Sequence, residues 1–342
     1  MRVDMRKRRP KTQPSEPART TLTEHKGKPA FILAADDHVR NGAPECRTDN
    51  YVEAIFKKLE FRNTIAKEYN IPILHAGDIG DKSYFVKDGN GWTSTIYNRH
   101  IEAMGSTTIL CVAGNHDLPG HDIENINQSA LGALIKSEDA ELLDEIPTCI
   151  NGIDTYGASW DCEIPKPTNH SNTNILVIHK MIINNLPLWP GQEAPKAQDI
   201  LKQNPDYDLI VSGDNHQAFT SEYKQRLLVN CGSMMRSTTK QFDHKPCFFL
   251  YYPESNSVEK VFYPTDPPEE VISLEHIKQK DNTNKRVEKY TNLVNTADLS
   301  ELKTFRENSE IFISSAKLSD NIIKMIQGFV NHEEPKKFEA KK

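Results

Sequence analysis

Apolar, β-rich runs alternate with helical patterns from Ala30 to Gly213. The strand-like runs cover 30–35, 71–76, 107–113, 174–179 and 207–212. Apolar residues at helical spacing occur at 51–69, 93–104, 127–145 and 196–203. Between them, Asn151-Gly152 separates two short apolar runs and predicts a β-hairpin over 148–158. This alternation is typical of an α/β fold in which helices cover a central sheet.

After Gly213 the pattern changes. Short β-like runs separated by turns predict an antiparallel stretch, and they cover 218–223, 226–230, 246–252 and 258–263. From Pro267 onward the chain is charged and mostly helical in pattern, with amphipathic spacing at 311–330. We therefore predict four parts: a basic, disordered arm (1–28), a catalytic domain (29–265), a helical cap or partner-binding region (266–332) and a charged tail (333–342).

Polar residues of the kinds that bind metals follow five of the predicted strands. The segments are Phe31–His38, Ile73–Asp81, Ile109–Asp117, Ile175–His179 and Leu209–His216. Because loops at the carboxyl ends of strands form the ligand crevice of open α/β sheets, these side chains are expected to meet. A pair of divalent cations in such a crevice can activate water and stabilise both oxygens of a phosphoryl displacement.

The chemistry of each side chain suggests a role. Asp78, at the tip of a Gly-Asp turn, suits a carboxylate that bridges two cations. Asp36 and His38 are two residues apart, so they reach one cation only if the chain bends there. Asn115 offers a neutral amide oxygen to the second cation.

The residue after Asn115 has a different expected role. His116 would face the substrate, where an imidazolium can protonate the leaving oxygen. A carboxylate commonly orients such a histidine, and either Asp117 or Asp81 is placed to do so. His75 lies within a predicted strand and is expected to support the site from the core.

The order of these motifs resembles that of the calcineurin-like metallophosphoesterases, over residues 29–265. The resemblance implies an α/β fold, a four-layer α/β/β/α sandwich with a small, mainly helical C-terminal appendage, and hydrolysis of phosphoester bonds. It also implies roles for individual residues: Asp36, His38 and His216 on the first metal, Asp78 bridging, Asn115 and His179 on the second, and His116 as catalytic acid and phosphate contact.

The last motif departs from the family pattern. The family has Gly-His-x-His, whereas this chain has Gly213-Asp214-Asn215-His216. If Asp214 coordinates the second metal, the ligand carboxylates carry −3 in place of the usual −2, and oxygen-preferring ions such as Mn²⁺ or Mg²⁺ are favoured. We expect Mn²⁺, with Mg²⁺ or Fe²⁺ as alternatives. A weakened second site is the other interpretation.

Within the family, the chain is most similar to the SbcD-type DNA-repair nucleases and their phage relatives. Val229–Ser233 resembles the Asn-Pro-Gly-Ser turn of that branch, and a charged helical region follows the catalytic part. The resemblance implies a Mn²⁺-dependent DNA exonuclease or endonuclease. Ser233 and Arg236 would contact substrate phosphate, although a surface role for Arg236 is equally consistent. DNA, an SbcC-like coiled-coil ATPase and a second copy of the chain are the candidate partners.

Composition both supports and complicates this prediction. Segment 1–28 holds nine Lys or Arg against three acids, so it carries +6, while the remaining chain carries −12 of the total of −6. A basic arm can bind nucleic acid phosphates or act as a solubilising tail. The acidic remainder keeps open a phosphatase or nucleotide phosphodiesterase with a non-DNA substrate, and a non-catalytic binding protein is a further alternative.

Cysteine usage and hydropathy suggest the compartment. The six cysteines are scattered without a CxxC pair, which is typical of a reducing cytoplasm. No apolar run reaches the roughly 18 residues that a membrane helix needs. We therefore expect a cytoplasmic protein without a membrane partner.

Overall fold

The computed structural model describes 27–185, 187–188, 191–273, 275, 305–315, 318, 320, 322–324 and 326–327. The chain divides into two compact units, Met1–Leu274 and Glu275–Lys342. Almost all of the expected basic arm 1–28 and the whole tail 333–342 lie outside the described residues. The first unit contains all of the predicted site residues.

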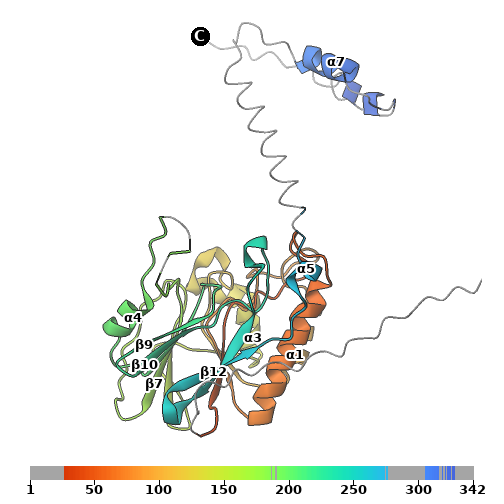
Figure 1. The fold of residues 1–342 in the computed structure, drawn as a ribbon. Coiled ribbons are helices and arrows are strands. Elements are labelled where there is room, and N and C mark those ends of the chain that lie inside the picture. The colour runs from red at the N-terminus through yellow and green to blue at the C-terminus, as the bar shows by residue number, and fades with distance from the viewer. Residues whose placement is uncertain are drawn as a thin grey trace, which may run out of the picture. The chain divides into compact units, whose positions relative to one another are not determined.

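The first unit contains two six-stranded mixed sheets (Figure 1). The first sheet has the order β12-β11-β1-β2-β3-β4. Its strands are β1 (Phe31–Ala34), β2 (Ile73–His75), β3 (Ile109–Cys111), β4 (Glu141–Leu142), β11 (Cys247–Tyr252) and β12 (Ser257–Phe262). Strands β1 to β4 are parallel, whereas β11 runs antiparallel to β1 and β12. The carboxyl ends of β1, β2 and β3 therefore lie along one edge.

The second sheet has the order β5-β6-β7-β8-β10-β9. Its strands are β5 (Thr148–Ile150), β6 (Ile153–Ala158), β7 (Thr173–His179), β8 (Leu209–Gly213), β9 (Phe219–Tyr223) and β10 (Arg226–Asn230). Strands β6, β7, β8 and β10 are parallel, and β5 and β9 are antiparallel edge strands. The predicted hairpin is confirmed as β5–β6.

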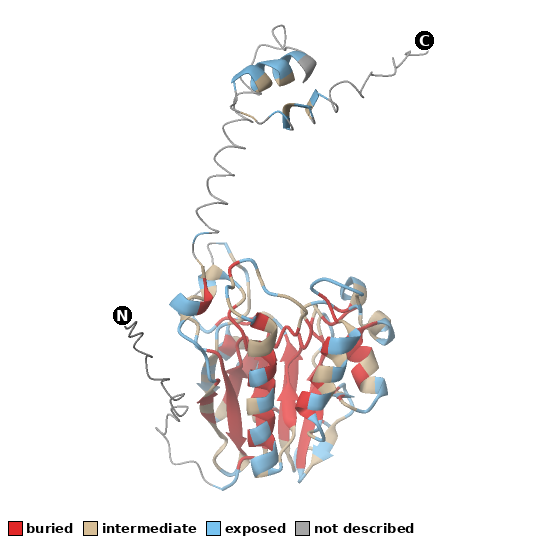
Figure 2. Cartoon of the chain, turned by 90° about the vertical axis from the view of Figure 1, so that its right-hand side faces the viewer, coloured by how far each residue is buried: buried red, intermediate tan, exposed pale blue. Residues whose placement is uncertain are grey.

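Side chains on alternate faces of the strands build three layers of core. In β1, Phe31 and Leu33 join the apolar cluster between the sheets, whereas Ile32 and Ala34 join the cluster beneath the helices. Helices α1 (Tyr51–Tyr69), α2 (Ser94–Met104) and α3 (Ala130–Lys136) cover the first sheet, and α4 (Ala197–Gln203) covers the second. Figure 2 shows the buried strands behind helices whose outer faces are exposed. The predicted four-layer α/β/β/α arrangement is confirmed.

Helix α1 illustrates how the local sequence sets an element. The Asn50 side chain accepts the N–H of Glu53 at 3.2 Å and caps the first turn. Asn70 ends the helix in the left-handed conformation, with φ 54°. Ile55 and Leu59, one helical turn apart, are fully buried against the sheet. Capping and periodicity agree here, and the predicted range 51–69 is confirmed.

The helix predicted over 127–145 is wrong for most of its length. A 3₁₀ helix, η2 (Ile123–Gln128), precedes the short α3, and the chain then turns at Glu138, with φ 62°. Residues 141–142 instead pair with β3 as strand β4. Polar residues at 137–139 hydrogen-bond locally and compete with the helix, and pairing with β3 favours the strand.

The antiparallel stretch predicted after Gly213 is divided between the two sheets. Hairpin β9–β10 continues the second sheet, and β11–β12 crosses to the first. Three further short helices lie in this part of the chain: η3 (Thr239–Gln241), η4 (Pro253–Ser255) and α5 (Pro268–Val271). Another 3₁₀ turn, η1 (Pro119–His121), follows the third motif.

The packing of the first unit continues beyond residue 265, where the sequence pattern placed a boundary. Val271 and Ile272 pack with Cys46, and the Ser273 N–H donates to the Cys46 carbonyl at 2.8 Å. Residues 266–273 thus complete the first unit. In the second unit the structure describes one continuous helix, α7 (Phe305–Ser315), on which Ile311 and Phe312 are exposed. The rest of the predicted amphipathic segment 311–330 is described only in part.

Within the described part of the chain, every helix is too short or too polar to cross a bilayer.

Candidate metal centre

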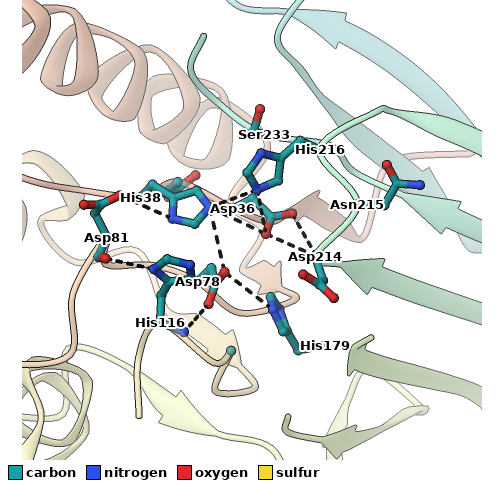
Figure 3. Close-up of polar contacts among 12 residues, drawn as sticks. Asp36, His38, Asp78, Asp81, His116, His179, Asp214, Asn215, His216 and Ser233 are labelled. Atoms are coloured by element: carbon teal, nitrogen blue, oxygen red, sulfur yellow. Dashed lines mark hydrogen bonds and ion pairs between the residues drawn. The ribbon is translucent and has the colours of Figure 1, made fainter. Parts of the chain in front are cut away.

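The loops after β1, β2, β3, β7 and β8 converge at one edge of the two sheets (Figure 3). The first two loops are joined directly. Asp36 N–H donates to the Gly77 carbonyl, and His38 N–H donates to the Asp78 carbonyl, both at 3.0 Å. Asp36, His38 and Asp78 all have left-handed backbone angles, with φ 52°, 46° and 56°. The bend that the sequence required between Asp36 and His38 is therefore present.

Asp36, His38 and His216 form the first cluster of potential ligands. The Nε2 atoms of the two histidines lie 3.1 Å apart. Each of these nitrogens is 4.0 Å from Oδ1 of Asp36. Two imidazoles from distant segments and one carboxylate thus surround one point, in the combination expected for the first metal.

Asp36, Asp78 and His179 form the second cluster. The Nε2 atom of His179 lies 3.5 Å from Oδ2 of Asp78 and 3.1 Å from Oδ1 of Asn115. The other ring nitrogen, Nδ1, donates to the Ala76 carbonyl at 2.7 Å. That hydrogen bond fixes the tautomer in which Nε2 is free to bind a cation. Oδ2 of Asp78 is also 3.8 Å from His38 Nε2, so Asp78 is placed between the clusters.

Glycines allow these loops to approach one another. A Cβ on Gly114 would lie 2.1 Å from Oδ1 of Asp78, and one on Gly213 would lie 2.4 Å from the Ala76 carbonyl. Either side chain would displace a loop that carries a potential ligand. Close packing at the site thus requires glycine at positions 114 and 213.

The electrostatics of the site fit divalent cations. Burial, followed by the charge of Asp78, raises the pKa of Asp36 well above its ordinary value. Burial also raises the pKa of Asp78 to about 6. Burial lowers the pKa of His38 and of His179, so both rings are neutral at pH 7. The neutral imidazoles are in the protonation state that metal ions require, and divalent cations would supply the counter-charge that the crowded carboxylates lack.

His116 lies at the accessible edge of the centre. Its Nδ1 donates to the Asp81 main-chain carbonyl at 2.9 Å, and its ring meets that of His38 edge to face at 4.9 Å. Its own N–H donates to Oδ1 of Asp78 at 2.9 Å. Since Nδ1 is committed, Nε2 is the ring nitrogen available to a substrate.

The expectation that Asp117 orients His116 is wrong. The Asp117 carboxylate is buried and accepts the N–H groups of four residues at 2.7–3.3 Å: Asp78, Ile79, Gly80 and Gly114. Asp117 therefore ties the loop after β2 to the loop after β3. The Asp81 carboxylate pairs with Arg40 at 3.1 Å and forms a third group of potential ligands with His38 and His116. The main chain of Asp81 holds the ring.

Asp214 occupies the position where the family pattern has histidine. Its N–H donates to both oxygens of Asp36, at 3.1 and 3.2 Å, and its backbone is left-handed, with φ 74°. Burial raises the pKa of its carboxyl, and the charge of Asp78 raises it further against the opposing effect of His179. The carboxyl thus belongs to the charge balance of the centre. Asn215 points away (Figure 3) and donates to the Ile182 carbonyl.

Two of the predicted substrate contacts, Ser233 and Arg236, are bonded to main-chain carbonyls. Ser233 is buried, its hydroxyl donates to the Met235 carbonyl at 3.0 Å, and it points away from the cluster in Figure 3. Arg236 is 6 % exposed and donates to the main-chain carbonyls of His244 and Asp266. Both side chains hold the loop after β10, and their contact with a substrate phosphate stays a prediction.

Sequence reasoning missed the buried support beneath the centre. Asp37, between two potential ligands, receives two hydrogen bonds from Arg62 at 2.8 and 2.6 Å. His75 Nε2 lies 3.2 Å from the same carboxylate, which agrees with its predicted supporting role. Burial alone would raise the pKa of Asp37, but Arg62 and His75 together lower it. The sequence contained one signal of this support: Arg62 is a charged residue on the buried face of a helical pattern.

Comparison with known protein families identifies the family to which the sequence is similar. The sequence matches the calcineurin-like phosphoesterase superfamily domain over residues 32–251. No curated protein sequence matches the chain.

Among solved structures, a novel archaeal phosphodiesterase is 13 % identical, with a TM-score of 0.38 over 68 % of this chain and 98 % of that one. A putative 5′-nucleotidase from Staphylococcus aureus is 11 % identical, with a TM-score of 0.44 over 73 % of this chain and 57 % of that one. A dimetal phosphatase from Danio rerio is 10 % identical, with a TM-score of 0.37 over 70 % and 98 %.

Proposed function

Because the chain belongs to the calcineurin-like phosphoesterase superfamily and is a hydrolase of phosphoester bonds, we propose that it acts on phosphodiesters and that its substrate is DNA. The acidic residue at Asp214 is the observation that carries the preference for a diester. Its carboxyl, whose pKa responds to His179 and Asp78, would add a third carboxylate to those of Asp36 and Asp78.

Charge balance connects these carboxylates to the substrate. Two divalent cations and three carboxylates leave a net charge of about +1, whereas two carboxylates would leave about +2. A phosphodiester carries one negative charge, and a phosphomonoester carries about −1.5 to −2 at pH 7. The acidic centre therefore complements the diester better than the monoester.

The residues of the chain divide the work of hydrolysis. Asp36, His38 and His216 would hold one cation, Asn115 and His179 the other, and Asp78 would lie between them. Divalent cations, when bound, polarise the phosphate and lower the pKa of water. His116 presents Nε2 to the leaving oxygen and donates a proton from it, while Nδ1 remains bonded to the Asp81 carbonyl.

Two sequence features support DNA as the diester. The Val229–Ser233 turn resembles that of SbcD-type nucleases, and the segment 1–28 carries +6. A smaller nucleoside phosphodiester is the second candidate, because the rest of the chain carries −12 and a DNA channel is lined by basic residues.

Two pairs of substrates test the proposal on the full chain with Mn²⁺. The first pair is bis(4-nitrophenyl) phosphate and 4-nitrophenyl phosphate, and we expect faster turnover of the diester. The second pair is single-stranded and double-stranded plasmid-length DNA, and we expect cleavage of at least one, weakening as salt is raised.

The outcomes separate the two parts of the proposal. Preference for the monoester would refute the phosphodiesterase assignment. Turnover of the small diester without cleavage of either DNA would refute DNA as substrate and favour the second candidate. The His116→Gln variant, purified in parallel, controls for contaminating nucleases.

A further inference from the structure

A cavity of about 660 Å³ lies beside the metal centre, at the carboxyl ends of β6 and β7. Its walls come from 158–164, 178–181 and 193–195. The potential ligand His179 is one of the lining residues, so the cavity and the centre share a wall. Its volume is within the range of sites that enclose a ligand of drug or nucleoside size.

Trp160 forms a fixed part of this wall. Its N–H donates to the Ala113 carbonyl at 2.8 Å, and the neighbouring Ser159 hydroxyl accepts the Ala113 N–H at 3.0 Å. These bonds attach Trp160 to the strand end that continues into Asn115 and His116. The indole is half-buried and meets the His179 ring at 6.1 Å with an interplanar angle of 60°. A flat group stacked on Trp160 would therefore lie next to a phosphate held at the centre.

The charges around the cavity disfavour the binding of a second phosphate there. Asp161, Glu163 and Glu193 are exposed carboxylates among its lining residues, against the single ammonium of Lys180. A neutral ring that carries N–H donors suits both the carboxylates and the indole. Adenine, cytosine and guanine all present an exocyclic amine, and Asp or Glu accepts from that of cytosine. Bases also stack on aromatic side chains.

We infer that this cavity binds a nucleobase bearing an exocyclic amine, attached to the phosphodiester that the metal centre cleaves; the inference rests on the proposed phosphodiesterase function. Trp160 stacks on the base, and Glu163 and Glu193 accept from its amine. A quaternary ammonium group is the competing occupant, since it too suits carboxylates and an indole. Such groups are held by cages of several aromatic rings, and Trp160 is the one indole or phenyl ring among the described lining residues.

Three phosphodiesters with the same leaving group test the inference on the full chain with Mn²⁺. They are the 4-nitrophenyl esters of deoxycytidine 5′-phosphate, of methyl phosphate and of phosphocholine. We expect kcat/KM for the deoxycytidine ester to exceed that for the methyl ester by about tenfold, the order of effect of one stacked base. The Trp160→Ala variant should lose this ratio, and Trp160→Phe should keep most of it.

The carboxylates are tested by comparing the deoxycytidine ester with the thymidine ester, whose base lacks the exocyclic amine. We expect preference for deoxycytidine, lost in the double variant Glu163→Gln, Glu193→Gln. The Glu222→Gln variant, on edge strand β9 of the same sheet, is the matched control and should keep the wild-type ratio.

Each result distinguishes this inference from the proposed function. Retention of the deoxycytidine-to-methyl ratio in Trp160→Ala, or wild-type preference for the phosphocholine ester, would overturn the nucleobase cavity. A Trp160-dependent ratio without cleavage of DNA would leave the cavity standing and refute DNA as the substrate. If no ester turns over, calorimetric titration with deoxycytidine 5′-monophosphate and with methyl phosphate makes the same comparison, and equal affinities would overturn the inference.

Discussion

The Asp78 carboxylate joins the main chain of His116 to the metal centre. Its Oδ1 accepts the His116 N–H at 2.9 Å, while its Oδ2 lies 3.5 Å from His179 and 3.8 Å from His38. The residue proposed to bridge the cations therefore also positions the proposed acid. This coupling makes it necessary to separate metal binding from proton donation by experiment.

Replacement of His116 by Gln should separate these two roles. Gln keeps the backbone N–H to Asp78 but offers no proton of suitable pKa, so we expect kcat on bis(4-nitrophenyl) phosphate to fall about 10²-fold or more. Bound metal, measured by elemental analysis, should remain at the wild-type level. A variant that loses metal in proportion to activity would show that His116 is a ligand and not the acid.

Asp78→Asn should stabilise the metal-free protein and weaken the stabilisation that metal binding gives. Burial raises the pKa of Asp78 to about 6, so above that pH the ionised carboxylate costs folding free energy in the metal-free protein. We expect the chelator-treated variant to be more stable than the wild type at pH 7.5, by roughly 1–3 kcal/mol. Mn²⁺ should raise the Tm of the wild type far more than that of the variant.

Calorimetry with and without chelator measures both effects. The exposed Asp88→Asn, which makes the same chemical change away from the centre, should behave as wild type in both conditions. Destabilisation of metal-free Asp78→Asn would mean that the attraction of the ionised carboxylate to His116 outweighs the cost of burying its charge.

Asp214→His would restore the family pattern and lower the ligand charge to that of two carboxylates. We expect the ratio of bis(4-nitrophenyl) phosphate to 4-nitrophenyl phosphate turnover to fall, because the net charge of the centre rises by about one. We also expect softer divalent ions such as Zn²⁺ to compete better with Mn²⁺. An unchanged ratio, with both metals bound, would show that Asp214 does not set the preference for diesters.

Asp117→Ala should be strongly destabilising although Asp117 is not expected to meet the substrate. The substitution leaves four N–H groups without their shared acceptor at a buried position. We expect the free energy of unfolding to fall by about 3 kcal/mol or more. Urea titration of the metal-free protein measures the loss, which a merely catalytic Asp117 would not produce.

Lys58 should make stability depend on pH in the alkaline range. It is buried, it donates to the Met234 carbonyl at 2.9 Å, and burial, followed by the charges of Arg47 and Arg236, lowers its pKa from 10.5 to about 7. Between pH 7 and 10.5 the unfolded state binds more protons at this site, so this contribution to stability rises with pH.

Lys58→Met should remove that dependence. Its gain in stability over the wild type is expected to be largest at pH 7 and to shrink as the pH approaches 10.5. Denaturant titrations at pH 7, 8 and 9 provide the measurement. Lys57→Met, an exposed change on the same helix, should leave the wild-type slope, and an equal slope in Lys58→Met would contradict the assignment.

Local sequence predicted most elements correctly because pattern and capping agree along most of the chain. Helix α1 is an example, with its Asn50 cap and buried Ile55 and Leu59. The failures lie where distant pairing decides. Residues 141–142 form a strand because the edge of β3 is open to pairing. Strand β11 follows β10 along the chain but pairs with β1 of the other sheet. No local pattern contains information about which edge is free.

For the site, the sequence alone determined which residues are available for metal chemistry. Carboxylate, imidazole and amide groups that follow apolar strands have few alternatives to a polar crevice, and Asp36, His38, Asp78 and His179 do converge there. Tertiary structure decided what each polar group faces. It turned Asp117 and Arg236 toward main-chain groups and placed Trp160 beside His179. The physical reason is that a side chain's chemistry is local, whereas its partners are set by packing between segments far apart in the chain.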